Sequence, residues 1–403
     1  MKILQINLYD LFSTGNIMLN IANTSRKKGH IAYTASKYMK CRRNDKPPFH
    51  IYIGNTIANN IHRYLSLITD LQECGSIIPT LLFIRKIKKI DPDIIHLHDI
   101  LGQFLNLDIL FAYLKKSNKP VVWTFHDCWA ITGRCIYFDA IGCNRWKTGC
   151  GNCPQIKYAP GTWFFDLSAW NFKRKKKLFT SLNNLTIVTP SKWLKDLVYE
   201  SFLGSYNTIV INNGINLDIF KPTTGDFYQK IRNLNKKIVL GVASSWSPRK
   251  GLDVFLQMDK ELPDDFSIVL VGIDASRLPN TKRITPIKLT KNPQELAEIY
   301  SAATVFANPR TEDNFPTVNL ESLACGTPIV TYQTGGSPES IDENTGLVVE
   351  KNNVAQFISA VIEVANNGKD FYQSNCLKRS QNYDMNAKFN EYVNLYEQIY
   401  ASK

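Results

Sequence analysis

Several features that would quickly assign a class are missing from this sequence of 403 residues. No apolar run reaches the ~20 residues that cross a bilayer, and the first residues, MKILQINLYD, look like a strand with polar interruptions, not a signal peptide. No internal repeat or low-complexity linker is evident. With 44% hydrophobic residues the chain can fill two ordinary domains. We therefore expect a soluble, globular, cytoplasmic protein and exclude the disordered and fibrous classes.

A balance of charge is also missing. Residues 1–200 contain 28 Lys and Arg against 13 Asp and Glu, a net +15, whereas residues 201–403 contain 20 against 22, a net −2. This asymmetry indicates that the first half faces an anionic surface, either phospholipid or nucleic acid. The strongest clusters are FIRKIKKI at 83–90 and WNFKRKKKLF at 170–179. Both bracket lysines with apolar residues as interfacial helices do, with a solvated basic face as the alternative.

Nine cysteines without a secretion signal predict reduced thiols rather than a disulfide framework. Five of them fall within residues 128–153, which form a Cys-rich insertion. Cys150 and Cys153 make a Cys-x2-Cys pair, and Cys135 with Cys143 would complete a tetrahedral thiolate site for structural zinc. Disulfides or free thiols are the alternatives.

Short apolar strands alternate with helical stretches along the chain, which is typical of parallel sheets covered on both faces. This α/β pattern predicts two doubly wound, Rossmann-like domains, residues 1–208 and 209–385, with residues 386–403 forming a helix that packs back on the first domain. Ligands bind beyond the carboxyl ends of strands in such sheets. The expected strands are KILQINLY, IAYTAS, DIIHLH, PVVWTFHD and LTIVTPS in the first domain and KIVLGVAS, FSIVLVG, TVFANP and TPIVTYQTGG in the second.

One strand end leads into an acidic helix, in the segment TEDNFPTVNLESLACGTPIV. Asp313 and Asn314 suit the N-cap and Pro316 the first turn, which predicts a helix over 315–325. On a helix, Asp313 and Glu321 would lie about 12 Å apart, too far for the carboxylate pair of a hydrolase. The amides of the first turn suit a phosphate between them, so the segment fits a nucleotide sugar. An acidic turn that only complements the helix dipole is the alternative.

Two other strand ends carry groups suited to an anion. Gly15 stands before a predicted helix after the first strand and would bring backbone amides to an anion. Arg249 and Lys250 precede a helix after KIVLGVAS. Two cations there would neutralise a diphosphate, with exposed loop charges as the alternative.

The motifs EDNFPTVNLESLACGTPIV, GVASSWSPRKGLD, FSTGN, HLHD and WTFHDCWAITGRC are spread over nearly the whole chain. Together they resemble family 4 glycosyltransferases with the GT-B fold, in particular the bacterial colanic-acid and exopolysaccharide branch. The resemblance implies two domains that face each other across a cleft, with the nucleotide sugar on the second domain.

The resemblance also implies roles for residues of the second domain. Glu321, as the second acid of a Glu-x7-Glu pair, would hold the donor ribose. The first acid, near the donor hexose, falls on Asp313, and the adjacent Glu312 leaves open which carboxylate faces the sugar. Lys250 matches the basic pair on the diphosphate, and Arg249 would replace the usual upstream Arg. The start of the acidic helix completes the expected donor site with Asn314, Phe315 and Thr317.

His126 falls where the family has a histidine near the reacting carbon, and its imidazole suits a hydrogen bond to a sugar hydroxyl. His96 and His98 are weaker candidates, because alternate strand positions are taken to face opposite ways and one ring is expected to be buried. The Cys-rich insertion directly after His126 is expected to shape an acceptor-side loop. GT-B enzymes generally need no catalytic metal, and no Asp-x-Asp metal motif follows a strand here, so structural zinc is the only candidate cofactor.

We therefore expect a retaining hexosyltransferase that uses a nucleotide diphosphate sugar. Its acceptor would be a growing, lipid-linked saccharide of a bacterial surface polysaccharide, reached at the anionic inner face of the membrane. A GT-B epimerase or hydrolase would share the nucleotide site. A basic nucleic-acid-binding protein is the other alternative, but no helix-turn-helix, zinc-finger spacing or RNA-binding motif accompanies the basic half, so no nucleic-acid partner is expected.

Overall fold

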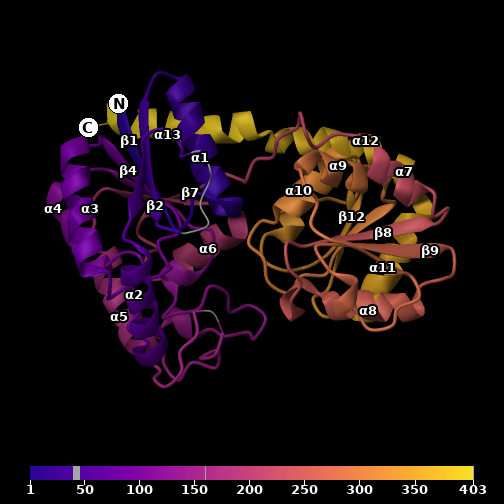
Figure 1. Ribbon diagram of the computed structural model, residues 1–403, viewed down its shortest axis with the longest axis horizontal. Coiled ribbons are helices and arrows are strands. Elements are labelled where there is room, and N and C mark those ends of the chain that lie inside the picture. The colour runs from indigo at the N-terminus through magenta and orange to yellow at the C-terminus, as the bar shows by residue number, and fades with distance from the viewer. Residues whose placement is uncertain (40–45, 159, 403) are drawn as a thin grey trace. The chain divides into compact units, whose positions relative to one another are not determined.

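The computed structural model describes residues 1–39, 46–158 and 160–402. The chain divides into two compact units, the first made of Met1–Ile211 with Phe389–Lys403 and the second of Asn212–Lys388. Each unit is built on one sheet of parallel strands with helices on both faces (Figure 1). The doubly wound α/β fold predicted from the alternating pattern is confirmed.

The sheet of the first unit has the strand order β3-β2-β1-β4-β5-β6-β7. The order reverses between β1 and β4, and the carboxyl ends of strands at such a switch point are where this kind of sheet binds ligands. The strands are β1 (Lys2–Asn7), β2 (Ile31–Lys37), β3 (His50–Ile53), β4 (Ile94–Leu97), β5 (Val121–Thr124), β6 (Leu185–Thr189) and β7 (Asn207–Val210). The helices are α1 (Phe12–Lys27), α2 (Thr56–Thr69), α3 (Ile77–Ile90), α4 (Leu107–Ser117), α5 (Ser168–Phe179) and α6 (Lys192–Glu200).

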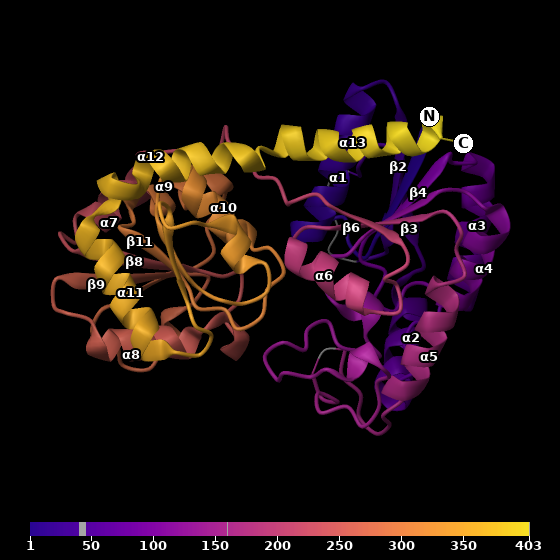
Figure 2. The same cartoon turned by 180° about the vertical axis from the view of Figure 1, so that it is seen from behind.

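The last helix, α13 (Met385–Ala401), completes the first unit with its residues from Phe389 onward (Figure 2). Tyr396 is fully buried, and its hydroxyl lies 2.5 Å from Nδ1 of His96 in β4. Lys28 donates to Asn394 at 2.8 Å, just beyond the end of α1. The C-terminal helix is therefore fixed to this sheet by a buried hydrogen bond as well as by polar contacts at its surface.

The sheet of the second unit has the order β10-β9-β8-β11-β12-β13, so its switch point lies between β8 and β11. The strands are β8 (Lys237–Val242), β9 (Phe266–Val271), β10 (Ile284–Ile287), β11 (Val305–Asn308), β12 (Ile329–Tyr332) and β13 (Gly346–Val349). The helices are α7 (Asp226–Arg232), α8 (Leu252–Glu261), α9 (Pro293–Ala302), α10 (Thr317–Ala324), α11 (Val354–Asn367) and α12 (Lys369–Ser380).

Every strand that the sequence predicts is present, but four further strands of the described ranges were missed. These are β3, β7, β10 and β13, and all four lie at sheet edges. Each has four residues and mixes buried with partly exposed positions. Edge strands are short and pack on fewer neighbours, so they lack the continuous apolar run by which a central parallel strand is recognised.

Candidate functional site

Two loops meet at the switch point of the second sheet. The β8–α8 loop contains a 3-10 turn, Pro248–Lys250, and the β11–α10 loop lies beside it because the amide of Thr311 donates to the carbonyl of Arg249 at 3.0 Å. Gly251 has a φ of +75°, and a Cβ at this position would lie 2.5 Å from the carbonyl oxygen of Pro309. Only glycine allows the two loops to approach this closely. The loops thus form one wall where the sheet is expected to bind a ligand.

Three cationic side chains gather on these loops around one acid. Lys250 donates to the carbonyl of Ser245 at 2.7 Å. Burial, with the nearby charges of Arg310 and Arg249, lowers the pKa of Lys250 to about 8, while Asp313 opposes that shift. Arg310, which sequence reasoning missed, pairs with Asp313 at 2.5 Å. The excess of positive charge suits a diphosphate.

The acidic helix begins two residues later than predicted. Pro316 occupies the N-cap of α10 and no side chain caps the helix, so the assignment of Asp313 or Asn314 to the N-cap is wrong. The reason is that a proline drives the residue before it, here Phe315, out of the helical region. Asp313 instead lies in the loop, where its Oδ1 accepts the amide of Asn314 at 2.9 Å. Helical rise therefore does not measure the separation of Asp313 from Glu321.

Glu321 lies one turn into α10. It follows Thr317 by four residues, so these two half-buried side chains share a helix face. The hydroxyl of Tyr300 in α9 donates to Oε2 of Glu321 at 3.1 Å. Burial raises the pKa of Glu321 to about 7, although Tyr300 and Arg310 both act to lower it. Arg310 thus acts electrostatically on both Glu321 and Lys250.

The other residues predicted for the donor site differ in accessibility. Glu312 is half-buried in the β11–α10 loop. Asn314 and Phe315 are each 3% exposed, and the Phe315 ring packs on Tyr383 with 5.7 Å between centroids. These two side chains belong to the core of the loop, so their backbone is the part suited to meet a ligand.

His126 follows β5 in the first unit and lines a small pocket with His98 and Asp127. Nε2 of His98 lies 2.9 Å from Oε1 of Gln5, and Nδ1 of His98 lies 3.2 Å from Nε2 of His126. Because His98 donates to the Gln5 oxygen, His126 must be the donor to His98. Burial lowers the pKa of His126 to about 4, so the ring is neutral near pH 7 and its Nδ1 is a proton acceptor.

The expectation that His96 and His98 face opposite ways is wrong. Residues two apart on a strand share a face, and the two ring centroids lie 3.9 Å apart with both rings buried. Asp99, which follows them and lines the same pocket as His126, was missed. Burial and the neighbouring charge of Asp127 raise the pKa of Asp99 well above its ordinary value.

Gly15 does not precede a helix but lies in the first turn of α1. A Cβ there would lie 2.7 Å from the carbonyl carbon of Asp10 and 2.9 Å from the oxygen of Tyr9. Glycine is therefore needed for the close packing of α1 against the preceding loop. A role for Gly15 in donor binding stays a prediction.

The Cys-rich insertion brings two sulfurs together. The Sγ atoms of Cys135 and Cys153 lie 3.9 Å apart, and Cys150 accepts the amide of Gly133 at 3.1 Å. A tetrahedral thiolate site places its sulfurs about 3.8 Å apart, so the first pair has a suitable separation. Over the described ranges, however, no group of three or more His, Cys, Asp or Glu side chains is arranged to hold a metal. Structural zinc, with Cys143 as the fourth ligand, stays a prediction.

The basic run at 170–179 is not the free cationic surface that its composition indicates. Lys175 in α5 is buried, donates to the carbonyls of Trp129 at 2.8 Å and Thr132 at 3.1 Å, and lies 3.7 Å from the Trp129 ring centroid. Arg174 pairs with Asp108 at 2.7 Å. Lys175 and Arg174 therefore bind groups of the first unit, and contact of this run with an anionic surface stays a prediction for its exposed lysines.

Sequence reasoning missed three groups of the candidate site, and the reasons differ. Arg310 comes two residues after the end of β11, a strand beside the switch point, so its place in the topology was a usable signal. Asp99 was visible in HLHD, but the effect of Asp127 depends on two strand ends that are neighbours only in the fold. Tyr300 carries no sequence signal, since it reaches Glu321 from a different helix.

Two doubly wound units, with cations at the switch point of the second, form the architecture of GT-B glycosyltransferases. The model of Glycosyltransferase Family 4 matches residues 15–219, and that of Glycosyl transferases group 1 matches residues 236–367. The chain belongs to glycosyltransferase family 4.

Among curated proteins, the putative colanic acid biosynthesis glycosyl transferase WcaC of Escherichia coli K12 is 25% identical over 322 residues, which cover 76% of this chain and 77% of WcaC. The D-inositol 3-phosphate glycosyltransferase of Corynebacterium aurimucosum is 27% identical over 201 residues, which cover 44% of this chain and 48% of that protein. The predicted family and the glycosyltransferase class are confirmed.

Solved structures agree on the fold. Sucrose-phosphate synthase from Thermosynechococcus elongatus matches with a TM-score of 0.72 at 16% identity and covers 100% of both chains. Anabaena HepE in complex with UDP-glucose matches with a TM-score of 0.66 at 15% identity and covers 99% of this chain and 100% of HepE. The predicted GT-B fold is confirmed. Within the described ranges, no helix combines the length and apolar character needed to cross a membrane.

Proposed function

We propose that this glycosyltransferase moves a hexose from a nucleotide diphosphate sugar, with retention of configuration, to a growing, lipid-linked saccharide of a bacterial surface polysaccharide. The reaction would take place at the inner face of the membrane. The observation that carries the proposal is the group of Arg249, Lys250 and Arg310 around Asp313, electrostatically coupled to Glu321. Retention and the lipid-linked acceptor rest on the family resemblance.

The cationic group fits the chemistry of a leaving nucleoside diphosphate. Negative charge grows on the diphosphate as the bond to the hexose breaks, and preplaced cations stabilise that charge most in the transition state. Lys250 and Arg310 are held by backbone and side-chain partners, so they need little reorganisation. We assign both to the diphosphate, with Arg249 beside them.

Glu321 fits the ribose. A carboxylate accepts hydrogen bonds from two neighbouring hydroxyls, and such bonds favour its ionised form. The Tyr300 hydroxyl fixes the orientation of Glu321 and also favours ionisation. Asp313 already accepts from Arg310 and from the Asn314 amide, so it positions Arg310 in addition to any contact with the donor hexose.

His126 is the candidate for contact with a reacting sugar in the first unit. Its neutral ring, oriented by His98, offers Nδ1 as an acceptor for a hydroxyl of the donor hexose or of the acceptor. The names of two similar proteins support the class of substrate. HepE is solved with UDP-glucose, and WcaC is named for colanic acid biosynthesis.

A nucleotide-binding experiment tests the proposal. Thermal shift with UDP, GDP, ADP and dTDP should identify the base, and calorimetry with that nucleotide should then compare Glu321→Gln with the wild type. Loss of the charged hydrogen bonds should weaken binding by about 1.5–3 kcal/mol. Glu343→Gln, at an exposed position of the same unit, is the matched control and should bind normally.

Unchanged affinity of Glu321→Gln for every nucleotide that the wild type binds would exclude the ribose role. Product analysis with the matching nucleotide sugar separates the enzyme classes. A transferase attaches the hexose to an acceptor. An epimerase needs no acceptor and releases an isomeric free sugar or nucleotide sugar.

A further inference from the structure

Helix α2 buries polar side chains and exposes most of its large apolar ones. Asn59, His62 and Ser66 are buried at 4%, 1% and 7% exposure, and these polar residues are the only buried ones of the helix. A surface helix of a globular protein normally has the opposite arrangement. The outward face exposes Ile57 (72%), Ile61 (65%), Tyr64 (55%), Leu65 (37%) and Ile68 (41%), together with two polar side chains, Asn60 and Arg63.

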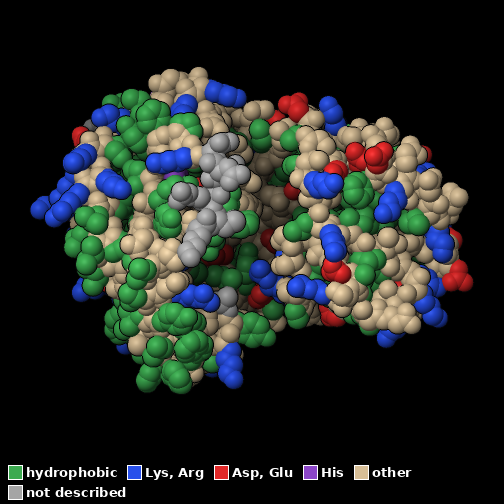
Figure 3. Space-filling view, viewed as in Figure 1, with side chains coloured by type: hydrophobic (Ala, Val, Ile, Leu, Met, Phe, Trp, Pro, Cys, Tyr) green, Lys and Arg blue, Asp and Glu red, His purple; other side chains and the backbone are tan. Residues whose placement is uncertain are grey.

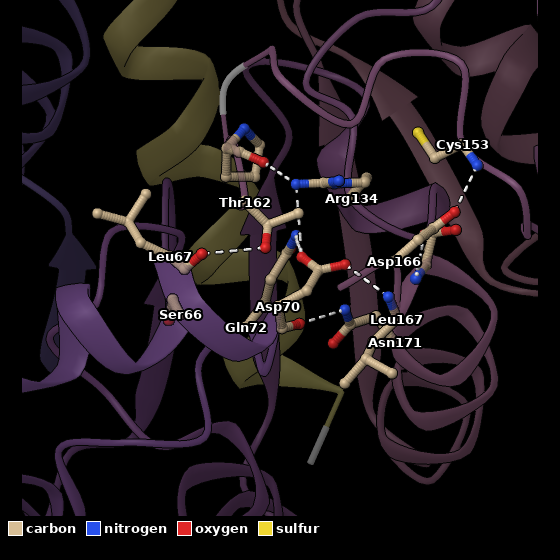
Figure 4. A network of polar contacts seen from close by, with 12 residues as sticks. Ser66, Leu67, Asp70, Gln72, Arg134, Cys153, Thr162, Asp166, Leu167 and Asn171 are labelled. Carbon is tan, nitrogen blue, oxygen red and sulfur yellow. Dashed lines mark hydrogen bonds and ion pairs between the residues drawn. The ribbon is translucent and has the colours of Figure 1, made fainter. Parts of the chain in front are cut away.

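Polar contacts fix this orientation from within. Asn59 donates to the carbonyl of Tyr38 at 3.1 Å, and Nδ1 of His62 lies 2.9 Å from Oγ of Ser76. At the C-terminal end of the helix, Asp70 is held by several groups at once (Figure 4). Rotation of α2 to bury its apolar side chains would break these contacts, so the exposed apolar face is part of the folded state.

Three aromatic side chains extend the apolar surface. The hydroxyl of Thr162 and the amide of Trp163 both donate to the carbonyl of Leu67, at 3.0 and 2.7 Å, which attaches their loop to α2. Trp163, Phe164 and Phe165 are 58%, 69% and 55% exposed. The Trp163 ring lies 6.4 Å from that of Tyr64. Trp and Tyr rings are enriched where proteins meet the bilayer interface.

Helix α3 adds both apolar and basic groups. It starts beside α2, because its N-cap residue Ser76 contacts His62. Its first half exposes Ile77, Ile78, Leu81 and Leu82. Its second half exposes Arg85, Lys86, Lys88 and Lys89. Neither α2 nor α3 contains an Asp or Glu.

We propose that these exposed groups of α2, α3 and residues 163–165, here called the α2–α3 face, dock on an anionic lipid bilayer. Figure 3 shows hydrophobic side chains gathered on the part of the first unit that carries α2 and α3, with Lys and Arg at the margin. Apolar and aromatic groups insert at the acyl boundary while the cations meet anionic headgroups, as in interfacial helices.

Charge favours a bilayer over a second copy of the chain. A symmetric dimer through this face would place its basic residues close to each other without an acidic residue from either helix to pair them. An anionic membrane satisfies the apolar and the basic groups together. The inference rests on the proposed lipid-linked acceptor for its biological purpose, but the surface itself is defined by the first unit alone.

Vesicle flotation of the full chain tests the inference. The wild type should float with phosphatidylglycerol-containing vesicles, less as salt rises, and little with pure phosphatidylcholine. The triple variant Trp163→Ser, Phe164→Ser, Phe165→Ser should bind at least about tenfold more weakly. Leu289→Ser with Phe371→Ser removes equally exposed apolar groups from the second unit and should bind like the wild type.

A charge series gives a second, independent readout. Changing Arg85, Lys86, Lys88 and Lys89 to Gln should lower binding to anionic vesicles by at least about tenfold and remove most of its salt dependence. Lys176→Gln with Lys177→Gln, on exposed positions of α5, is the control for loss of charge elsewhere and should have a smaller effect.

Several results would overturn the inference. They are absence of flotation, equal binding to neutral and anionic vesicles, or unchanged binding by the triple variant. A solution dimer that the triple variant dissociates would assign the face to a second copy instead. Donor hydrolysis in solution separates this inference from the proposed function. The rate of donor hydrolysis should be equal in all variants. Binding to vesicles without turnover of any nucleotide sugar would support the docking face but contradict the proposed function.

Discussion

The two units share a doubly wound topology but differ in what they expose and what they bury. In the described part of the second unit, the exposed large apolar side chains are few and separated in sequence: Leu234, Leu289, Val348 and Phe371. The first unit exposes whole helix faces, carries the excess of positive charge and holds all six histidines. The same scaffold thus carries a candidate ligand site in one unit and an extended apolar and basic surface in the other. Function here follows from loops and helix exteriors rather than from the sheet.

The largest expected effect on one unit alone comes from removing cysteines of the Cys-rich insertion. Metal analysis of the purified chain should find close to one zinc, and Cys150→Ser with Cys153→Ser should remove it. Because structural zinc contributes directly to folding, hydrogen exchange in residues 128–153 should rise sharply in that variant. Cys74→Ser, outside the insertion, should keep the metal. A metal-free wild type in which Cys135, Cys143, Cys150 and Cys153 react as thiols would contradict the zinc site.

A substitution of Lys175 tests whether the lysines of the first unit stabilise its fold or are available to bind partners. Lys175→Met keeps the length of the side chain but leaves the carbonyls of Trp129 and Thr132 without the ammonium donor. We expect the free energy of unfolding to fall by about 1–3 kcal/mol, the cost of one buried unpaired group, because the Trp129 carbonyl keeps the amide of Thr132 as a donor at 3.3 Å. Lys177→Met, at an exposed position of the same helix, should change it by less than about 0.5 kcal/mol.

Chemical denaturation followed by tryptophan fluorescence measures this difference. Equal stability of the two variants would mean that the contacts of Lys175 contribute nothing.

The sequence predicted the central strands because they are buried on both sides and nearly all apolar, as in FSIVLV of β9. It did not predict the edge strands, since their mixed patterns resemble loops. The donor-site candidates could be predicted from the sequence because they follow strand ends that the topology brings together. Arg310 shows the limit of this approach, because its effect on both Lys250 and Glu321 depends on distances that spacing along the chain does not encode.

The outward apolar face of α2 was missed for a related reason. Periodicity identifies an amphipathic helix but not which of its faces points inward. In α2 that choice is made by polar partners such as Ser76 and Tyr38, which are distant in sequence from the groups they bind. The interfacial role was predicted for two basic runs, 83–90 and 170–179. The first lies on α3 and belongs to the α2–α3 face, whereas Lys175 of the second proves to be a core residue.

Lowering the pH should change the stability of the two units in opposite directions. This effect should be smaller and more gradual than those of the substitutions above. Burial lowers the pKa of His50 to about 4 and that of His62 to about 3. Above pH ~6.5 these rings are neutral in both folded and unfolded chains. As the pH falls from ~6.5 towards 4, the unfolded chain takes up protons that the folded first unit cannot, so stability falls by up to about 1.4 kcal/mol per histidine and pH unit. Glu73, whose pKa burial raises to about 7, opposes this trend within the same unit.

The second unit should respond in the opposite direction. It has no histidine, and the raised pKa of Glu321, about 7, means that the folded state takes up a proton before the unfolded chain does, which is stabilising as the pH falls from ~7 to 4.5. Hydrogen exchange, corrected for its intrinsic pH dependence, should therefore show protection lost from the first unit between about pH 7 and pH 5 and kept in the second. His50→Gln should make the stability of the first unit depend less steeply on pH, by the slope that corresponds to about one proton, because it removes one ring that resists protonation. Equal loss of protection in both units, or a first unit that becomes more protected in acid, would show that its carboxyl groups rather than its neutral histidines set the pH dependence.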